Sequence, residues 1–248
     1  MVRIKLIVAY EGTNYVGWQY QPNGMSVQQR LEQAIHQLTG IIHTVYSSGR
    51  TDSGVHARGM VCHLTTEKEL PLTAWCAGLN RFLPDDIAVR HAEQVDDQFH
   101  ARFSARGKRY RYTVLRDSVR SPLDRKTSWQ VKKPLDLERM ENAAQSFIGR
   151  HDFSAFRTSG CSAKTTVREI YSIVFSEDDT LLHIDVCGSG FLRNMVRMMV
   201  GTLVQIGRGK RSVSVIQELL TDAKSLASPL TAPALGLCLM DVWFNDPL

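Results

Sequence analysis

The sequence predicts an α+β fold built from two similar halves, each mixing helices with mainly antiparallel strands. Three observations support this prediction. Residues 2–10 alternate apolar and polar side chains, as a half-buried strand does. A helix signature follows in residues 26–40, and a second series of helix and strand patterns begins near residue 106. This mixture of elements favours α+β architecture over a doubly wound parallel sheet.

The first half, residues 1–105, is expected to open as a strand, a loop and a helix. Ser26 followed by Gln29 is a capping-box signature, and Gly40 supplies the stop after a run of apolar residues at helical spacing. A strand near 60–66, a helix over 73–82 that ends before Pro84, and a strand over 87–95 complete this half.

The second half, residues 106–248, repeats the same kinds of element without a readable sequence repeat. Its expected strands and helices are, in order, a strand at 108–116, a helix at 136–148 stopped by Gly149, strands at 168–175 and 181–187, two further helices, and a last strand at 237–244.

The composition excludes several classes of protein. The charged and hydrophobic fractions, 22% and 43%, are those of an ordinary globular chain, and no low-complexity tract indicates disorder. The first residues lack the apolar stretch of a signal peptide, and no run of roughly 18 apolar residues indicates a membrane span. Five scattered cysteines without a CxxC pair predict neither a disulfide framework nor a zinc ribbon. We therefore expect a cytoplasmic protein with no membrane association.

Positive charge is concentrated in one segment. The whole chain carries a formal charge of +5. Nine basic residues against two acidic ones fall between Arg102 and Lys126, which gives this segment alone +7. Such a cluster favours an anionic partner, and its basic residues are candidate phosphate contacts.

The segment SSGRTDSGVHARG, residues 47–59, has charged side chains in a glycine-rich turn between strand-like stretches. Judged from the residues alone, Asp52 near Arg50 is more often part of an Asx-turn or a surface ion pair than a catalyst. For His56 the stronger interpretation is a ring bonded to backbone, and for Arg58 a side chain facing solvent or phosphate. His56, Cys62, His63 and Cys76 lack regular metal-ligand spacing, so no metal site is predicted.

GRTDSGVHA at residues 49–57 resembles the signature of the tRNA pseudouridine synthase A family. The resemblance continues in the same order through nearly the whole chain. It is carried by AYEGTNYVGWQ, LPDDI, FHARFSARGKRYRY, GRHDFSAFR and GFLRNMVRMMVGTL. It implies the pseudouridine synthase fold, with one continuous core around a central RNA-binding cleft, and a reaction that needs no cofactor.

The resemblance also assigns roles to particular residues. Asp52 corresponds to the catalytic carboxylate, Arg197 to the arginine that pairs with it, and Tyr110 to the tyrosine that stacks on the target base. From the residues alone, Arg197 lies on the polar side of an amphipathic helix, and Tyr110 and Tyr112 share a strand face that is usually core. We expect Tyr110 at the site and Tyr112 as packing support.

Other basic residues are expected to hold RNA. Arg50 corresponds to the family arginine that enters the helix beside the flipped nucleotide, although a salt bridge within its own loop is an equal alternative. The remaining candidate RNA contacts are Arg58, Lys108, Arg109, Arg157, Lys164, Arg168 and Arg193. The polar stretch 158–166 is expected to form a mobile loop.

Partners and target follow from the resemblance alone. It implies a homodimer that acts on the anticodon stem-loop of tRNA at positions 38, 39 and 40. Three alternatives remain open at this point. They are a non-catalytic RNA-binding module, another enzyme such as a glycosylase or ribonuclease, and a pseudouridine synthase with a different RNA target.

Overall fold

The computed structural model describes residues 1–158, 160, 163–221 and 228–245. The chain forms two compact units. The first contains Met1–Arg106 together with the last strand from Cys238, and the second contains Gly107–Leu237. The last strand, which the sequence places in the second half, therefore groups with the first unit.

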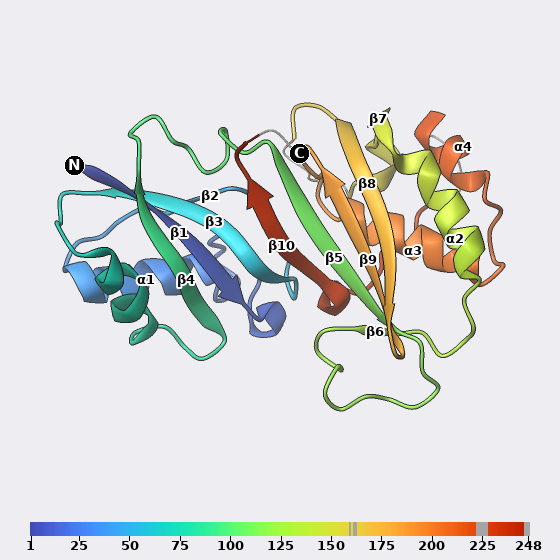
Figure 1. Cartoon of the computed structure of the whole chain (residues 1–248), viewed down its shortest axis with the longest axis horizontal. Helices are drawn as coiled ribbons and strands as arrows, with labels where there is room; N and C mark the ends of the chain where they lie inside the picture. The colour runs from blue at the N-terminus through green and yellow to red at the C-terminus, as the bar shows by residue number, and fades with distance from the viewer. Residues whose placement is uncertain (159, 161–162, 222–227, 246–248) are drawn as a thin grey trace. The chain divides into compact units, whose positions relative to one another are not determined.

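The first unit contains a mixed sheet in which β1 is central (Figure 1). The strand order is β4-β1-β3-β10, and β1 runs antiparallel to both of its neighbours. By contrast β10 pairs with β3 in parallel, through Cys238 with His56 and Leu239 with Ala57. A short β2 also pairs with β3, in antiparallel orientation, with Tyr46 opposite His63. The strands are β1 (Val2–Tyr10), β2 (Tyr46–Ser47), β3 (His56–Thr66), β4 (Ile87–Val95) and β10 (Leu237–Trp243).

Helix α1 (Val27–Thr39) confirms the helix predicted from its caps. The Ser26 side chain accepts a hydrogen bond from the Gln29 amide, and Gly40 ends the helix in the left-handed conformation. Leu31 and Ile35 are fully buried on the apolar stripe that the sequence predicted. The helix expected over 73–82 differs, because its central turn is the π-helical η2 (Ala74–Gly78).

In the second unit the sheet order is β5-β9-β8-β7, with all neighbours antiparallel. A short β6 adds to β5 in parallel. Helices α2, α3 and α4 lie together beside this sheet (Figure 1). The elements are β5 (Gly107–Leu115), β6 (Trp129–Gln130), α2 (Leu137–Ala144), β7 (Gly149–Asp152), β8 (Val167–Asp178), β9 (Leu181–Gly188), α3 (Met195–Gly207) and α4 (Val215–Thr221). Single 3-10 turns occur at η1 (Gly12–Asn14), η3 (Gln145–Phe147), η4 (Ser154–Phe156) and η5 (Ala234–Gly236).

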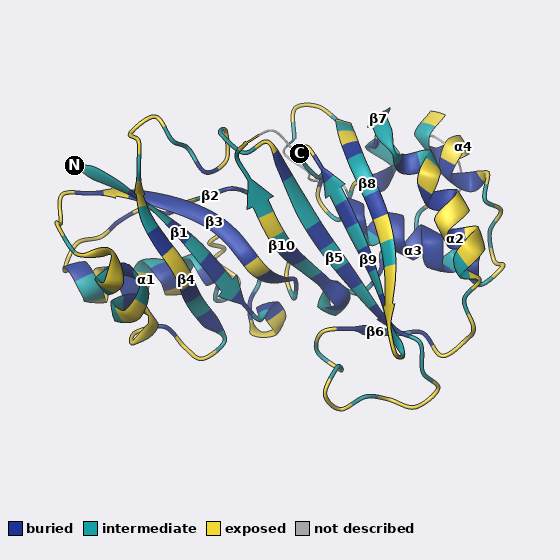
Figure 2. Ribbon diagram, in the orientation of Figure 1, coloured by how far each residue is buried: buried dark blue, intermediate teal, exposed yellow. Residues whose placement is uncertain are grey.

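The core of the second unit is centred on α3, which is buried along almost its whole length (Figure 2). An apolar helix of this kind needs cover on several sides, and α2 packs along it. Strand β5 buries alternate residues, among them Tyr110, Tyr112 and Val114, as its sequence predicted. Both units are therefore mixed α/β, which confirms the coarse fold class, while the central cleft stays a prediction.

Among the described residues, no helix has both the length and the apolar character required to cross a bilayer.

We expect Ser26→Ala to lower the free energy of unfolding by about 1 kcal/mol, because the Gln29 amide loses its cap and the site is buried. Urea unfolding checks this. Ser176→Ala removes an exposed hydroxyl from β8 and serves as the control, with an expected change below about 0.5 kcal/mol. Equal losses in the two variants would contradict a capping role for Ser26.

Candidate active site

Asp52 begins a tight turn in the loop that joins β2 to β3, which we call the Asp loop (Ser48–Val55). The Val55 amide donates to the Asp52 carbonyl over 3.1 Å and closes a four-residue turn. Gly54 stands third in that turn with φ 77°, the left-handed conformation that a type II turn requires at this position. Asp52 itself is half-buried. The glycine-rich pattern therefore makes a turn that presents the carboxylate.

Residues 10–18 hold the Asp loop on both sides of Asp52. The Tyr10 and Thr51 hydroxyls are hydrogen bonded at 2.8 Å, and the Trp18 amide donates to the Thr51 carbonyl at 3.1 Å. On the other side, the Tyr15 carbonyl accepts from the Ser53 hydroxyl at 3.1 Å. Because the bonds flank Asp52 directly, they fix its backbone independently of what its carboxylate contacts.

Gly17 allows this close approach. Its φ is 113°, and a Cβ added there would lie 2.6 Å from the Thr51 carbonyl oxygen and 3.2 Å from the Asp52 carbonyl carbon. Real Cβ atoms do not come so close to backbone. Any larger residue at position 17 would therefore displace the chain that carries Asp52.

His56 fixes the far end of the loop. Its Nδ1 accepts a hydrogen bond from the Gly12 amide at 3.0 Å, and the residue is only 6% exposed. An imidazole nitrogen that accepts a hydrogen bond carries no proton, so the ring is neutral with its proton on Nε2. This confirms the interpretation of His56 as a histidine bonded to backbone.

A second layer stands behind residues 10–18. The Tyr15 hydroxyl donates to the Asp86 carboxylate at 2.5 Å, and the Asp86 carbonyl accepts from the Glu11 amide at 2.9 Å. Burial, followed by this bond to Asp86, raises the pKa of Tyr15 far above its usual range, so the phenol keeps its proton as donor. The LPDDI segment thus supports the residues that hold the Asp loop.

In the second unit, Tyr110 and Tyr112 lie two residues apart on β5 with different surroundings. Tyr110 is 8% exposed and packs edge to face against Phe191, with ring centroids 5.2 Å apart. Tyr112 is fully buried, and its hydroxyl donates to the Pro233 carbonyl at 2.8 Å. Burial raises the pKa of Tyr112, and the nearby Arg197 charge opposes the shift. The expectation that Tyr112 supports the packing is confirmed.

Arg197, in the first turn of α3, is held in place within the second unit. Its Nε donates to the Ala232 carbonyl at 2.7 Å, and a terminal nitrogen donates to the Asn194 side chain at 2.7 Å. The Ala232 amide in turn donates to the Arg197 carbonyl at 3.1 Å. Tyr112 of β5 bonds to Pro233, the residue after Ala232. The segment that contains Ala232 and Pro233 therefore contacts both Arg197 and β5.

The candidate RNA contacts fall into separate groups. Arg50 and Arg58 are exposed on the Asp loop and β3 of the first unit. In the second unit, a Cβ added to Gly160 would lie 3.8 Å from Arg193, and the Asn194 amide donates to the Thr158 hydroxyl at 3.2 Å. Arg193 therefore lies beside the polar stretch 158–166.

That stretch carries three more candidates. A terminal nitrogen of Arg168 donates to the Thr165 carbonyl at 3.0 Å, and Arg157 and Lys164 are exposed. Arg157 also faces Asp152, whose pKa is lowered chiefly by a hydrogen bond from Thr166. The mobility expected of 158–166 concerns in part residues 159 and 161–162, which lie outside the described residues.

Two arginines of the basic segment 102–126 are paired with acidic residues from other strands of the second unit. Lys108 and Arg109 are half-exposed on β5. By contrast Arg111 makes a two-pronged salt bridge with Asp185 on β9, at 3.0 and 2.7 Å, and Arg116 pairs with Glu177. These two arginines are neutralised within the second unit and are poor candidates for phosphate contacts.

No three His, Cys, Asp or Glu side chains gather as a set of metal ligands in the part of the chain that the structure describes.

A model of the tRNA pseudouridine synthase family matches residues 6–104 and 143–245. The chain belongs to this family. The matched ranges include Asp52 and Arg197, whereas Tyr110 lies between them. Members of this family are isomerases, which makes this chain an isomerase and removes a non-catalytic RNA-binding module, a glycosylase and a ribonuclease from the alternatives.

Curated relatives agree with this assignment over nearly the whole chain. All three that follow are named tRNA pseudouridine synthase A. The relative from Syntrophotalea carbinolica is 55% identical over 96% of this chain and 95% of its own length. That from Pelobacter propionicus is 53% identical over 98% and 99%. That from Myxococcus xanthus is 47% identical over 99% and 93%.

Several residues that build the site carried no predicted role. Tyr10 ends the strand predicted over 2–10, and Tyr15, Gly17 and Trp18 fall in the loop after it, where the sequence indicates only turns. Their available signal was the density of aromatic residues around glycines in a loop, which is unusual for an exposed turn. What they bind, the Asp loop, lies more than thirty residues away and follows only from the pairing of β1 with β3.

We expect Gly17→Ala to lower both stability and the rate of pseudouridine formation, because the new Cβ meets the backbone at Asp52. Gly40→Ala is the matched control, since Gly40 also has a positive φ, 74°, with no atom within 4 Å of an added Cβ. The control should cost about 1 kcal/mol through backbone strain. Gly17→Ala should cost roughly 2 kcal/mol more through overpacking, measured by urea unfolding. Equal losses would show that the Asp loop does not depend on Gly17.

Proposed function

We propose that this enzyme converts uridine to pseudouridine in the anticodon stem-loop of tRNA, at positions 38, 39 and 40, with Asp52 as the nucleophile and no cofactor. The observation that carries the proposal is the Asp loop, in which a carboxylate sits on a turn fixed by hydrogen bonds on both sides. The family match over most of the chain supports uridine in tRNA as the substrate.

The reaction rearranges bonds without changing the formula of the nucleoside. The bond between uracil N1 and ribose C1′ breaks, the uracil turns, and C5 bonds to C1′ while its proton leaves and N1 gains one. A carboxylate suits this sequence because it can attack either ribose C1′ or uracil C6 to form a covalent intermediate and then leave again. Neither oxidant nor reductant is required, so a carboxylate and a proton acceptor suffice.

A positioned carboxylate is the central requirement. A nucleophile held near its target gains rate because the cost of orienting it has been met during folding. The bonds from residues 10–18 supply this in the first unit, and the half-buried state of Asp52 leaves its side chain within reach of a ligand. Burial around a bound base favours the neutral acid, so a cation is needed to keep the carboxylate charged.

We assign that cation to Arg197 and the stacking ring to Tyr110. In support, Arg197 has its orientation fixed by Ala232 and Asn194 before any ligand arrives. Tyr110 lies on the same strand as Tyr112, which is bonded to the segment that holds Arg197.

The RNA is proposed to bind through its backbone, with the target base flipped out of its stack. We assign Arg50 to the space that the flipped nucleotide leaves, because its side chain is exposed two residues before Asp52. Phosphate contacts are proposed for the exposed or half-exposed residues Arg58, Lys108, Arg109, Arg157, Lys164, Arg168 and Arg193. We further propose that the enzyme works as a homodimer in the cytoplasm.

We expect Asp52→Asn to abolish turnover, with a fall of at least about 1000-fold, because an amide does not act as a nucleophile here. The assay incubates the enzyme with tRNA tritiated at uracil C5, without added cofactor, and follows tritium release. Asp85→Asn, which neutralises an exposed acid of the same unit, is the control and should retain full activity.

Three outcomes of the same assay decide against the proposal. Tritium release that is equal in Asp52→Asn and the wild type removes Asp52 as nucleophile. Tritium release that depends on an added cofactor removes the cofactor-free reaction. Pseudouridine mapped outside positions 38, 39 and 40 removes the anticodon stem-loop as the target.

We also propose that the Tyr110 phenol takes part in removing the C5 proton, so Tyr110→Phe should bind tRNA normally and turn over about 100-fold more slowly. Tyr112→Phe is the control. It should lose about 1 kcal/mol of stability, because the Pro233 carbonyl loses its buried donor, yet keep its turnover rate. An unchanged rate for Tyr110→Phe would remove this hydroxyl from the site.

A further inference from the structure

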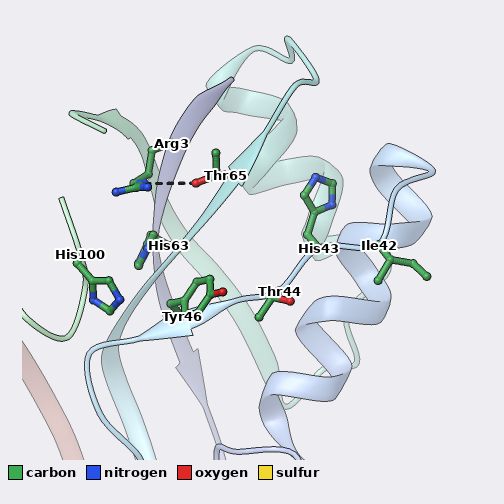
Figure 3. Close-up of a pocket in the computed structure, with 8 residues that line it drawn as sticks. All are labelled: Arg3, Ile42, His43, Thr44, Tyr46, His63, Thr65 and His100. Atoms are coloured by element: carbon green, nitrogen blue, oxygen red, sulfur yellow. Dashed lines mark hydrogen bonds between the residues drawn. The ribbon is translucent and has the colours of Figure 1, made fainter. Parts of the chain in front are cut away.

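A hollow of about 570 Å³ opens in the first unit, away from the Asp loop. Figure 3 shows its lining side chains, which come from β1, from the stretch leading into β2, from β3, and from the segment after β4. Its volume falls within the range of small-ligand pockets, roughly 300 to 1,000 Å³. The lining residues used below are Arg3, Tyr46, His63 and His100.

A series of ring contacts runs from the floor of this hollow to the surface. Tyr46 stacks on His63 with ring centroids 5.3 Å apart and planes 25° apart. His63 meets His100 at 4.8 Å, and His100 meets Phe103 at 4.3 Å. Tyr46 is 51% exposed, His63 3% and Phe103 77%, so the series is buried at His63 and open to solvent at both ends. The rings thus form a surface that is fixed at His63.

Two of these rings are exposed without an evident structural reason. Tyr46 is 51% exposed, so the packing of its ring against His63 still leaves much of it open to solvent. Phe103 is more exposed still, with the Arg102 guanidinium 5.9 Å from its ring centre. Aromatic rings accompanied by cations on a surface are typical of sites where nucleobases stack.

The polar groups of the hollow favour an anion. Arg3 donates to the Thr65 hydroxyl and to the Asp97 and Phe99 carbonyls, while its second terminal nitrogen makes no hydrogen bond with a described residue. His100 accepts from the Arg102 amide through Nδ1, which leaves Nε2 as a donor. None of the lining residues is acidic.

His63 supplies the neutral floor. Burial lowers its pKa to about 4, with the neighbouring His100 and Arg3 adding to the effect, so the ring is uncharged at pH 7. Its Nδ1 accepts from the Ala101 amide at 3.2 Å, which ties the 100–104 turn to β3. A neutral, fixed ring suits stacking, and the charge that attracts phosphate comes from Arg3 above it.

The hollow and the Asp loop lie along the same strand. Tyr46 pairs with His63, seven residues along β3 from His56 at the end of the Asp loop. At about 3.4 Å per residue, His63 in the hollow lies roughly 24 Å from His56. This separation exceeds one nucleotide, so a ligand of the hollow would be a different part of an RNA whose target uridine reaches Asp52.

We infer that the hollow, together with the Phe103 ring that contacts its lining residue His100, holds one unstacked nucleotide of the RNA substrate, with its base on these rings and Tyr46 and its phosphate at Arg3. This second contact rests on the proposed function for the identity of the RNA. It would anchor the substrate at a distance from the reacting base and so contribute to binding and to the choice of RNA rather than to chemistry.

The test compares Tyr46→Leu and Phe103→Leu with Phe82→Leu, a control that alters an exposed ring of the same unit that belongs neither to the lining of the hollow nor to the series of ring contacts described above. Leucine keeps apolar bulk and removes the stacking face. With full-length tRNA at one fixed salt concentration, each of the first two variants should raise Kd roughly 5- to 150-fold, while the control stays within about two-fold. The loss should appear in KM much more than in kcat.

Two outcomes would overturn the inference. The first is an unchanged Kd for both Tyr46→Leu and Phe103→Leu. The second is a fall in the molecular mass of either variant by light scattering at the concentration used for binding, which would assign these rings to contact between copies of the chain.

A separate variant distinguishes this inference from the proposed chemistry. Asp52→Asn should bind tRNA within about two-fold of the wild type while releasing no tritium. If Asp52 is not the nucleophile, Asp52→Asn will still release tritium. If the hollow does not bind RNA, Tyr46→Leu and Phe103→Leu will leave Kd unchanged.

Discussion

The structure depends on one constraint, which is that the turn bearing Asp52 must be held by backbone and hydroxyl bonds that do not involve its carboxylate. Tyr10, Tyr15 and Trp18 supply these bonds, and Gly17 lets them form at short range. Tyr10 is the last residue of strand β1. The pairing of β1 with β3 therefore brings residues 10–18 to the start of β3. The register of β1 on β3 therefore determines how the turn that bears Asp52 is held.

The second unit also holds a side chain of the candidate site in place, through a helix and a segment that crosses it. Arg197 projects from α3, a helix so apolar that it must be buried, and the Ala232 segment crosses it with hydrogen bonds in both directions. The hydrogen bonds from the Arg197 guanidinium to Ala232 and Asn194 thereby limit this long side chain to few rotamers. A charged side chain held in this way loses little conformational entropy when a ligand arrives.

Local patterns predicted much of the fold, and long-range pairings explain what they missed. Periodicity placed β4 at its observed residues, and caps placed α1 within a residue at each end. No local pattern reveals that Arg111 faces Asp185, because that contact follows from the register of β5 on β9. Parallel pairing of β10 with β3 was missed for the same reason, since it joins residues about 180 positions apart.

The candidate site shows the same division. Asp52, Arg197 and Tyr110 are proposed because their motifs resemble those of a family, and His56 was interpreted correctly from general frequencies. The residues that position them were not found, because a tyrosine that bonds to a distant threonine looks like any other tyrosine in a loop. Sequence motifs therefore name candidate reacting groups, but they do not name the contacts that hold those groups in place.

The parallel partner of β3 also sets an order of events during synthesis. Cys238 and Leu239 pair with His56 and Ala57, the residues that directly follow the Asp loop. While the chain is still on the ribosome, these residues of β3 lack their parallel neighbour until the chain has been extended by about 180 residues. The nascent first unit thus exposes an open strand edge beside the Asp loop until β10 has been synthesised.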